Sequence, residues 1–171
     1  FVNLFMPSTL NWEEKNIKLT QNTKFPYENG SELVLELDKE KTFGINIRYP
    51  EWAKDFEVSV NGTIKKITKN PSSYININKT WKSGDKITVK FKTTTHLENL
   101  PDGSNWVAFV NGPIVLAAKT YTKDLDGLFA DDSRMGHATH GKYYPLDKAH
   151  ALVGSKDTYL NKLKETGKLR F

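Results

Sequence analysis

The stretch of residues 42–62, TFGINIRYPEWAKDFEVSVNG, constrains the fold of this chain more than any other. Apolar and polar residues alternate on both sides of Tyr49-Pro50, which predicts two strands that each bury one face. Proline donates no backbone hydrogen bond and keeps the preceding residue extended, so this pair ends the first strand. Asn61-Gly62 suits the positive φ angles of a tight type I′ turn after the second strand. We therefore predict antiparallel β structure with Trp52 at a corner between the strands.

The alternation recurs about every 8–12 residues, with turn residues between the apolar runs. The last two runs are almost continuously apolar, which favours central strands of a sandwich with Trp106 buried. Together the pattern predicts an all-β fold, an antiparallel β-sandwich of the jelly-roll-like type. Further strands are expected at residues 2–6, 33–37, 74–78, 87–91, 106–110 and 114–118.

The regular pattern ends near residue 120, which divides the predicted organisation in two. Residues 1–120 form the β-sandwich, and residues 121–171 form an irregular loop extension draped over it or over a neighbouring domain. Residues 157–164 carry apolar positions at helical spacing, so one short helix is expected there, with Ser155 as its cap. The chain opens without methionine and closes on what resembles the start of a strand. We expect a fragment of a larger protein, with a further C-terminal domain.

Composition and charge exclude several classes of protein. The 171 residues contain no cysteine, so disulfides, thiolate nucleophiles and cysteine-ligated zinc are excluded. The formal net charge is +5, but 20 acidic residues are interspersed with 25 basic ones and no basic block stands out. We therefore expect no nucleic-acid partner. No apolar run approaches the roughly 18 residues of a membrane helix, so no membrane partner is expected.

The densest group of chemistry-bearing residues lies in the loop of residues 131–141. Carboxylates and imidazoles so close together could hold a divalent metal, or supply an acid and a base. The loop shows no metal-ligand spacing such as H-E-x-x-H, so aspartates that cap turns and histidines that bond to backbone are the alternative. We predict a ligand contact rather than a metal site, and keep a metal-dependent hydrolase as a weaker alternative. The candidate residues are Asp131, Asp132, Arg134, His137 and His140.

Tryptophans are the second group of candidates. An indole face can stack on the C–H face of a sugar ring, so Trp12, Trp52 or Trp81 could form a carbohydrate platform. The alternative is that Trp52 and Trp81 close the ends of the sandwich, and both interpretations are kept for these two residues. The sequence has no G-x-S-x-G elbow and no glycine-rich phosphate loop. No catalytic residue is assigned.

Five short segments occur in an order that is similar to that of a known family. They are VNLFMPS at 2–8, IRYPEWA at 47–53, VNG at 60–62, WKSGD at 81–85 and VAFVNGPIVLAA at 107–118. Together they resemble the β-sandwich region that comes after the catalytic barrel in β-L-arabinofuranosidase-type glycoside hydrolases, family 127 and its relatives. The segment DDSRMGH resembles the region after the sandwich in the longer, Bacteroides-like members.

The resemblance implies an accessory role. In that family an upstream (α/α)₆ barrel carries a cysteine nucleophile and a zinc site of cysteines and a glutamate, and none of these positions can be assigned in a chain without cysteine. We therefore expect a non-catalytic chain without a cofactor, while the barrel of the parent enzyme binds zinc. The expected partners are that missing barrel and a C-terminal domain of the same polypeptide, so that the chain supports or shapes the sugar site.

The alternative function is an independent carbohydrate-binding module that uses exposed aromatic residues to bind a plant-type oligosaccharide. For the parent protein the resemblance implies a periplasmic or extracellular location.

Overall fold

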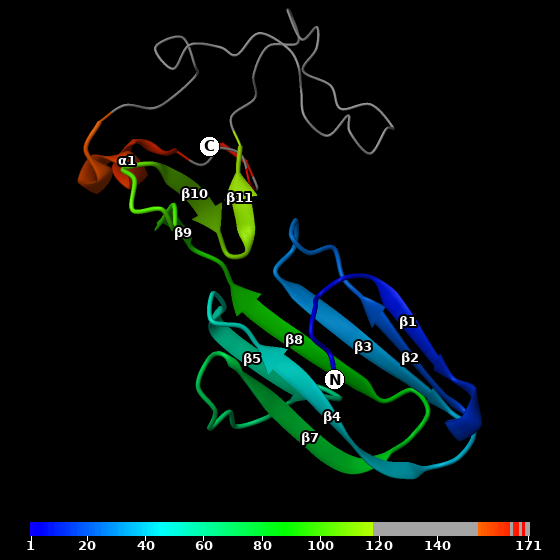
Figure 1. The fold of residues 1–171 in the computed structure, drawn as a ribbon. Helices are drawn as coiled ribbons and strands as arrows, with labels where there is room; N and C mark the ends of the chain where they lie inside the picture. Colours follow the sequence, from blue (N-terminus) through cyan, green and yellow to red (C-terminus); the bar gives the residue numbers. More distant parts are fainter. Residues whose placement is uncertain (118–153, 165, 168, 170–171) are drawn as a thin grey trace, which may run out of the picture. The chain divides into compact units, whose positions relative to one another are not determined.

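The computed structural model describes residues 1–117, 154–164, 166, 167 and 169 (Figure 1). The chain divides into two compact units, Phe1–Val115 with Lys164–Phe171, and Leu116–Leu163. No helix in the described ranges is long and apolar enough to cross a membrane. The strands are β1 (Ser8–Trp12), β2 (Ile17–Asn22), β3 (Gly30–Leu37), β4 (Lys41–Tyr49), β5 (Lys54–Val60), β6 (Thr63–Ile64), β7 (Ser73–Trp81), β8 (Lys86–Lys92), β9 (Thr95–Asn99), β10 (Val107–Asn111) and β11 (Ile114–Leu116). The helices are a short 3₁₀ helix η1 (Glu13–Lys15) and α1 (Lys156–Lys162).

The strands form three antiparallel sheets. The wide sheet has six strands in the order β1-β2-β3-β8-β5-β6, and the narrow sheet consists of β4 and β7, which lie side by side (Figure 1). A third sheet has the order β11-β10-β9. The predicted all-β, antiparallel, sandwich-like fold is confirmed, and so is the short helix, which begins after Ser155.

The stretch of residues 42–62 folds as β4, a corner and β5, as predicted. The two strands are not partners, however, because β4 pairs with β7 and β5 pairs with β8. Pro50 is buried, and the Ala53 N–H donates to the Pro50 carbonyl at 3.3 Å. The corner therefore moves the chain from the narrow sheet to the wide sheet. Asn61 and Gly62 have φ angles of 49° and 81°, which confirms the predicted tight turn between β5 and β6.

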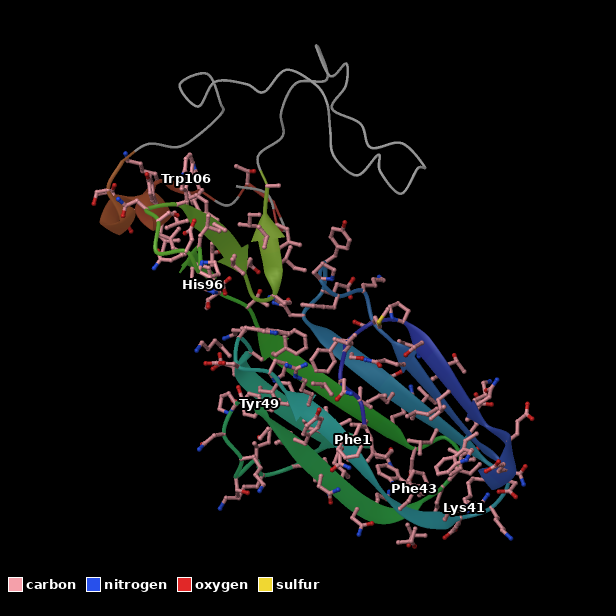
Figure 2. All side chains as sticks on the ribbon, in the orientation of Figure 1. Phe1, Lys41, Phe43, Tyr49, His96 and Trp106 are labelled. Atoms are coloured by element: carbon pink, nitrogen blue, oxygen red, sulfur yellow. The ribbon has the colours of Figure 1, made fainter. Side chains whose placement is uncertain are left out.

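The core lies between the inner faces of the wide and narrow sheets. Alternate residues of β3, β4, β5, β7 and β8 point into this core, because side chains of a strand alternate between faces and residues paired across strands share a face. Figure 2 shows β4 running from Lys41 past Phe43 to Tyr49. The largest fully buried side chains come from both sheets and are Trp81, Leu33, Leu35, Ile47, Ile87, Val58 and Val89.

Two local predictions are wrong. Residues 2–6 form no strand: Val2 makes a single parallel bridge to Ile47, while Val2 and Phe5 insert their side chains into the core. The first strand is β1, which comes after this segment. Trp106 is 51% exposed, and β10 and β11 are not central strands of the sandwich. They pair in the third sheet, where Val110 is buried but the side chains of β10 before it are only half-buried.

Some apolar residues on the inner face of the wide sheet are not covered by the narrow sheet. Leu10 pairs with Leu19 and Trp12 pairs with Ile17, so Leu10 and Trp12 lie on the core-facing side of β1. Ile17 is buried and Leu19 packs against the core, yet Leu10 and Trp12 are 54% and 45% exposed. We call Leu10 and Trp12 the overhang. It arises because a sheet of two strands cannot cover the inner face of a sheet of six.

This difference in burial predicts a difference in stability. Leu35→Ala should lower the free energy of unfolding by about 2–5 kcal/mol, because it leaves a cavity in the core. Leu10→Ala should cost less than about 1 kcal/mol, although Leu10 lies on the same face of the same sheet. Urea denaturation followed by tryptophan fluorescence measures both changes. Equal losses would show that the overhang is covered within the chain.

Candidate functional site

The loop candidates lie outside the described residues. Asp131, Asp132, Arg134, His137 and His140 all fall between residues 118 and 153, so a ligand contact there stays a prediction. In the part of the chain that the structure describes, no group of three or more histidines and carboxylates could hold a metal ion.

Trp81 is a core residue. Its side chain has 0% exposure, and its indole N–H donates to the Phe43 carbonyl at 2.8 Å. The Lys79 ammonium lies 5.0 Å from the centre of the Trp81 ring, and the Phe43 ring packs at 6.0 Å. A sugar cannot reach this ring in the folded chain. The prediction that Trp81 binds a ligand is therefore wrong. Its burial supports the alternative, that Trp81 is an anchor of the sandwich.

Trp52 is held by other aromatic rings at the corner between β4 and β5. Phe25 stacks on it with ring centres 5.6 Å apart and planes 5° apart, while Phe5 and Phe91 meet it edge-on. The indole is half-buried. One ring face is thus occupied by Phe25, which fits the role of corner anchor better than that of an open platform.

A pocket of about 590 Å³ lies along the exposed part of Trp52, within the first compact unit. Its charged groups are Glu51, Lys54 and Glu98, together with His96, which lies on β9 (Figure 2). His96 Nε2 is 3.5 Å from Glu98 Oε1. These groups could hydrogen-bond to a polar ligand. No contact found in the described part of the chain places a nucleophilic side chain beside them.

The WKSGD segment forms a buried polar junction around Asp85. This residue is 8% exposed, and its carboxylate accepts hydrogen bonds from Lys79 Nζ at 2.9 Å, the Lys82 N–H at 3.0 Å and Asn61 Nδ2 at 2.7 Å. Its carbonyl accepts from the Leu35 N–H at 3.0 Å. One residue therefore joins β7, β8, β3 and the turn after β5.

The electrostatics of Asp85 identify it as a structural group. Burial favours the neutral acid and raises its pKa, but the hydrogen bonds from Lys79, the Lys82 N–H and Asn61 outweigh burial and lower the pKa to about 2. A carboxylate with so low a pKa and with donors on both oxygens is a poor general acid or base at neutral pH. We therefore assign the junction a structural role.

The sequence predictions missed the overhang. Its signal was present, because Leu10 and Trp12 alternate with Thr9 and Asn11 in the segment STLNW. Trp12 was treated only as a possible sugar platform, and β1 was not predicted. Which face of β1 points to the core follows only from its pairing with β2.

The fold is an all-β sandwich. The wide sheet leaves Leu10 and Trp12 exposed on its inner face, and exposed apolar patches mark sites of interaction with another surface. Comparison with known families agrees: residues 1–93 match the middle domain of the GH127 β-L-arabinofuranosidases. Residues 96–171 match a family described only as a domain of unknown function.

The chain belongs to the GH127 β-L-arabinofuranosidase family, and its residues 1–93 correspond to the middle domain of that family. The two family matches meet between residues 93 and 96, whereas the strand pattern of the sequence predicts a boundary at residue 120. A search of curated proteins finds no match.

Solved structures show the same fold in much longer proteins. A glycoside hydrolase is 28% identical with a TM-score of 0.54, over 63% of this chain and 19% of the other. A GH127 β-arabinofuranosidase is 26% identical with a TM-score of 0.52, over 64% and 20%. Ara127N, a GH127 β-L-arabinofuranosidase from Geobacillus stearothermophilus T6, is 24% identical with a TM-score of 0.56, over 66% and 19%, and shows the fold alone. The chain thus spans about a fifth of the length of these proteins.

The Asp85 junction predicts a pH-dependent contribution to stability. The pKa falls from 3.8 to about 2 on folding, so ionised Asp85 stabilises the fold by about 2 kcal/mol at neutral pH. The pKa of Asp85 is lower in the folded chain than in the unfolded chain. Its stabilising contribution is therefore fully present above pH 3.8 and is lost as the pH falls through about 2. Asp85→Asn should therefore be destabilised at pH 7, and its difference from the wild type should shrink across this window.

Urea denaturation at a series of pH values measures the difference. Asp55→Asn is the matched control, because Asp55 pairs with Lys92 at 2.8 Å but both side chains are largely exposed. It should have little effect, since surface ion pairs contribute little. A difference for Asp85→Asn that does not change with pH would contradict the assignment.

Proposed function

We propose that the chain packs through its overhang against another domain of the same polypeptide, and that it thereby supports the sugar site of a β-L-arabinofuranosidase. The exposure of Leu10 and Trp12 on the core-facing side of β1 carries this proposal. Leu4 and Met6, which precede the overhang in the chain, are also exposed, at 60% and 53%. Leu10 and Trp12 lie on one face of one strand, and exposed apolar side chains that gather on one face are typical of surfaces that another protein surface covers.

The hydrophobic effect favours covering the overhang with another surface. Full burial of a Leu side chain stabilises a fold or an interface by about 1.5–3 kcal/mol. Leu10 and Trp12 are about half exposed, so further burial against another surface would be favourable. The charged side of β2 and β3 shows the contrast: on the outer face, Lys18 pairs with Glu36 at 2.8 Å, as expected of a surface in water. Only the inner face of this end of the sheet is apolar and open.

The relatives are much longer than this chain, which indicates where a partner for the overhang could come from. The aligned part of this chain makes up only 19–20% of each matched structure, so a polypeptide of that kind has other domains that can cover the overhang. One of these proteins, at 26% identity, is a β-arabinofuranosidase by name, which supports the same activity for the parent protein. A catalytic (α/α)₆ barrel with its zinc site is the partner that the sequence resemblance implies. The described residues offer zinc no ligand set, and the chain has no cysteine.

The alternative of a carbohydrate-binding module that uses tryptophan platforms has less support. Trp81 is enclosed and Trp52 is stacked on Phe25. Trp12 remains exposed, but the Lys15 ammonium lies 6.0 Å from its ring centre and the residue belongs to the overhang. The same exposed ring that could stack on sugar is better explained as part of a docking surface.

A charge placed on the overhang tests the proposal. In the isolated chain, Leu10→Asp should change the free energy of unfolding by no more than about 0.5–1 kcal/mol, because Leu10 is exposed there. In the complete polypeptide the same change should lower the thermal stability and the arabinofuranosidase activity together, since it buries an unpaired carboxylate in the interface. Calorimetry and hydrolysis of a p-nitrophenyl β-L-arabinofuranoside measure these effects.

Thr9→Asp is the matched control. Thr9 precedes Leu10 on the same strand, is exposed and lies on the outer face, so the substitution adds the same charge outside the proposed interface. It should leave both measurements unchanged in both contexts. If Leu10→Asp is as harmless as Thr9→Asp in the complete polypeptide, the overhang is not a docking surface.

A further inference from the structure

The outer face of the narrow sheet has an unusual composition. Its side chains are amides, hydroxyls, one glycine, one tyrosine and one arginine, without any carboxylate. All are exposed except Asn46, which is half-buried. The outward residues of β4 and their partners on β7 are Thr42 with Thr80, Gly44 with Asn78, Asn46 with Asn76, and Arg48 with Tyr74. We call this set the Asn-Thr face.

The outer face of the wide sheet provides an internal comparison. Ion pairs join neighbouring strands there, Lys18 with Glu36 at 2.8 Å and Lys86 with Glu32 at 3.3 Å. Long charged side chains of this kind are the ordinary covering of a sheet face in water. The Asn-Thr face, although also exposed, has one long charged side chain, Arg48, and no ion pair among its residues is found in the structure. Its composition is therefore not explained by solubility alone.

Cross-strand hydrogen bonds hold the polar groups of the Asn-Thr face in place. The hydroxyls of Thr42 and Thr80 are 2.7 Å apart, and Asn76 Nδ2 donates to Asn46 Oδ1 at 2.9 Å. A side-chain amide has two N–H donors and an oxygen with two lone pairs, so each amide keeps groups that can bond to a ligand. Because the side chains are already ordered, less conformational entropy is lost on binding.

Gly44 keeps space open beside these amides. A Cβ atom at this position would lie 3.1 Å from Asn76 Nδ2, which is tighter than an ordinary contact. Any larger residue would therefore displace the Asn76 amide or cover it. A ligand can reach the amide from the side of Gly44.

An aromatic ring stands at one end of the Asn-Thr face. Tyr74 is 38% exposed, and its hydroxyl donates to Asn3 Oδ1 at 2.6 Å. The Phe1 ring meets it edge-on, with centres 5.2 Å apart, and Phe1 lies along β4 between Tyr49 and Phe43 (Figure 2). Tyr74 is thus fixed at its hydroxyl and at its ring, and Arg48 is its cross-strand partner on β4.

We propose that the Asn-Thr face binds a neutral oligosaccharide. Fixed amides and hydroxyls match the vicinal hydroxyl groups of a sugar, and a partly exposed ring matches its C–H face. An acidic polymer would need more cations than Arg48 supplies, and an apolar ligand would find only Tyr74 and Phe1. The proposal does not depend on the overhang, which lies on β1 of the other sheet. The chain would then dock by one sheet and hold glycan on the other.

Nuclear magnetic resonance titration of the 171-residue chain tests the proposal. The probes are linear arabino-oligosaccharides and xylo-oligosaccharides, with oligogalacturonate as the charged control. Neutral sugar should shift the side-chain amide signals of Asn76 and Asn78 and the backbone signals of β4 and β7. Tyr74→Ala should weaken binding by about tenfold, the loss expected for a stacking ring.

Two further variants separate binding from folding. Asn78→Ala removes an exposed amide of the face and should also weaken binding, even if Tyr74→Ala disturbs the packing of Phe1. Thr88→Ala changes β8 on the outer side of the wide sheet and should leave the affinity unchanged. Three outcomes would overturn the proposal: no shift with neutral sugar, shifts confined to Trp12 or Trp52, or shifts that follow protein concentration and so indicate pairing of two copies. None of these outcomes would bear on the docking of the overhang, which Leu10→Asp tests.

Discussion

The packing of the narrow sheet on the wide sheet is the contact on which the rest of this structure depends. Trp81 illustrates it, because the ring is fully enclosed and its N–H is satisfied by the Phe43 carbonyl of the neighbouring strand. An isolated two-stranded sheet is marginal in water, so β4 and β7 need this contact to persist. The Asp85 junction adds a polar attachment, since it connects β7 to β8, β3 and the turn after β5.

The unequal width of the two sheets has functional consequences. A narrow layer buries only part of the wide inner face, and the remainder, Leu10 and Trp12, faces water. The uncovered edge is the surface on which the proposed docking depends, and the aligned part of this chain makes up only 19–20% of the matched structures. The outward side of the narrow sheet is in turn free of carboxylates and ion-pair ladders. Docking and ligand contact can therefore occupy different sheets without competing.

Local features of the sequence predicted the fold class well and the pairing of strands poorly. Alternation identified β4 and β5, and Asn61-Gly62 identified the turn after β5, because both signals depend on neighbouring residues. Pairing depends on contacts between distant residues, so the separation of β4 from β5 was not predicted. The site residues were less predictable: Trp81 is buried, Trp52 is stacked on Phe25, and the candidates between residues 131 and 141 lie outside the described part of the chain.

The sequence by itself determined the strand periodicity, the tight turns, the absence of cysteine chemistry and the order of segments typical of GH127 accessory sandwiches. These properties belong to single residues or to their neighbours along the chain. Only the tertiary structure decided that Trp81 is buried and Trp12 is not, although both occupy the apolar phase of a strand. The physical reason is that burial depends on whether a second layer covers a given face. That coverage depends on which strands pair across long stretches of sequence.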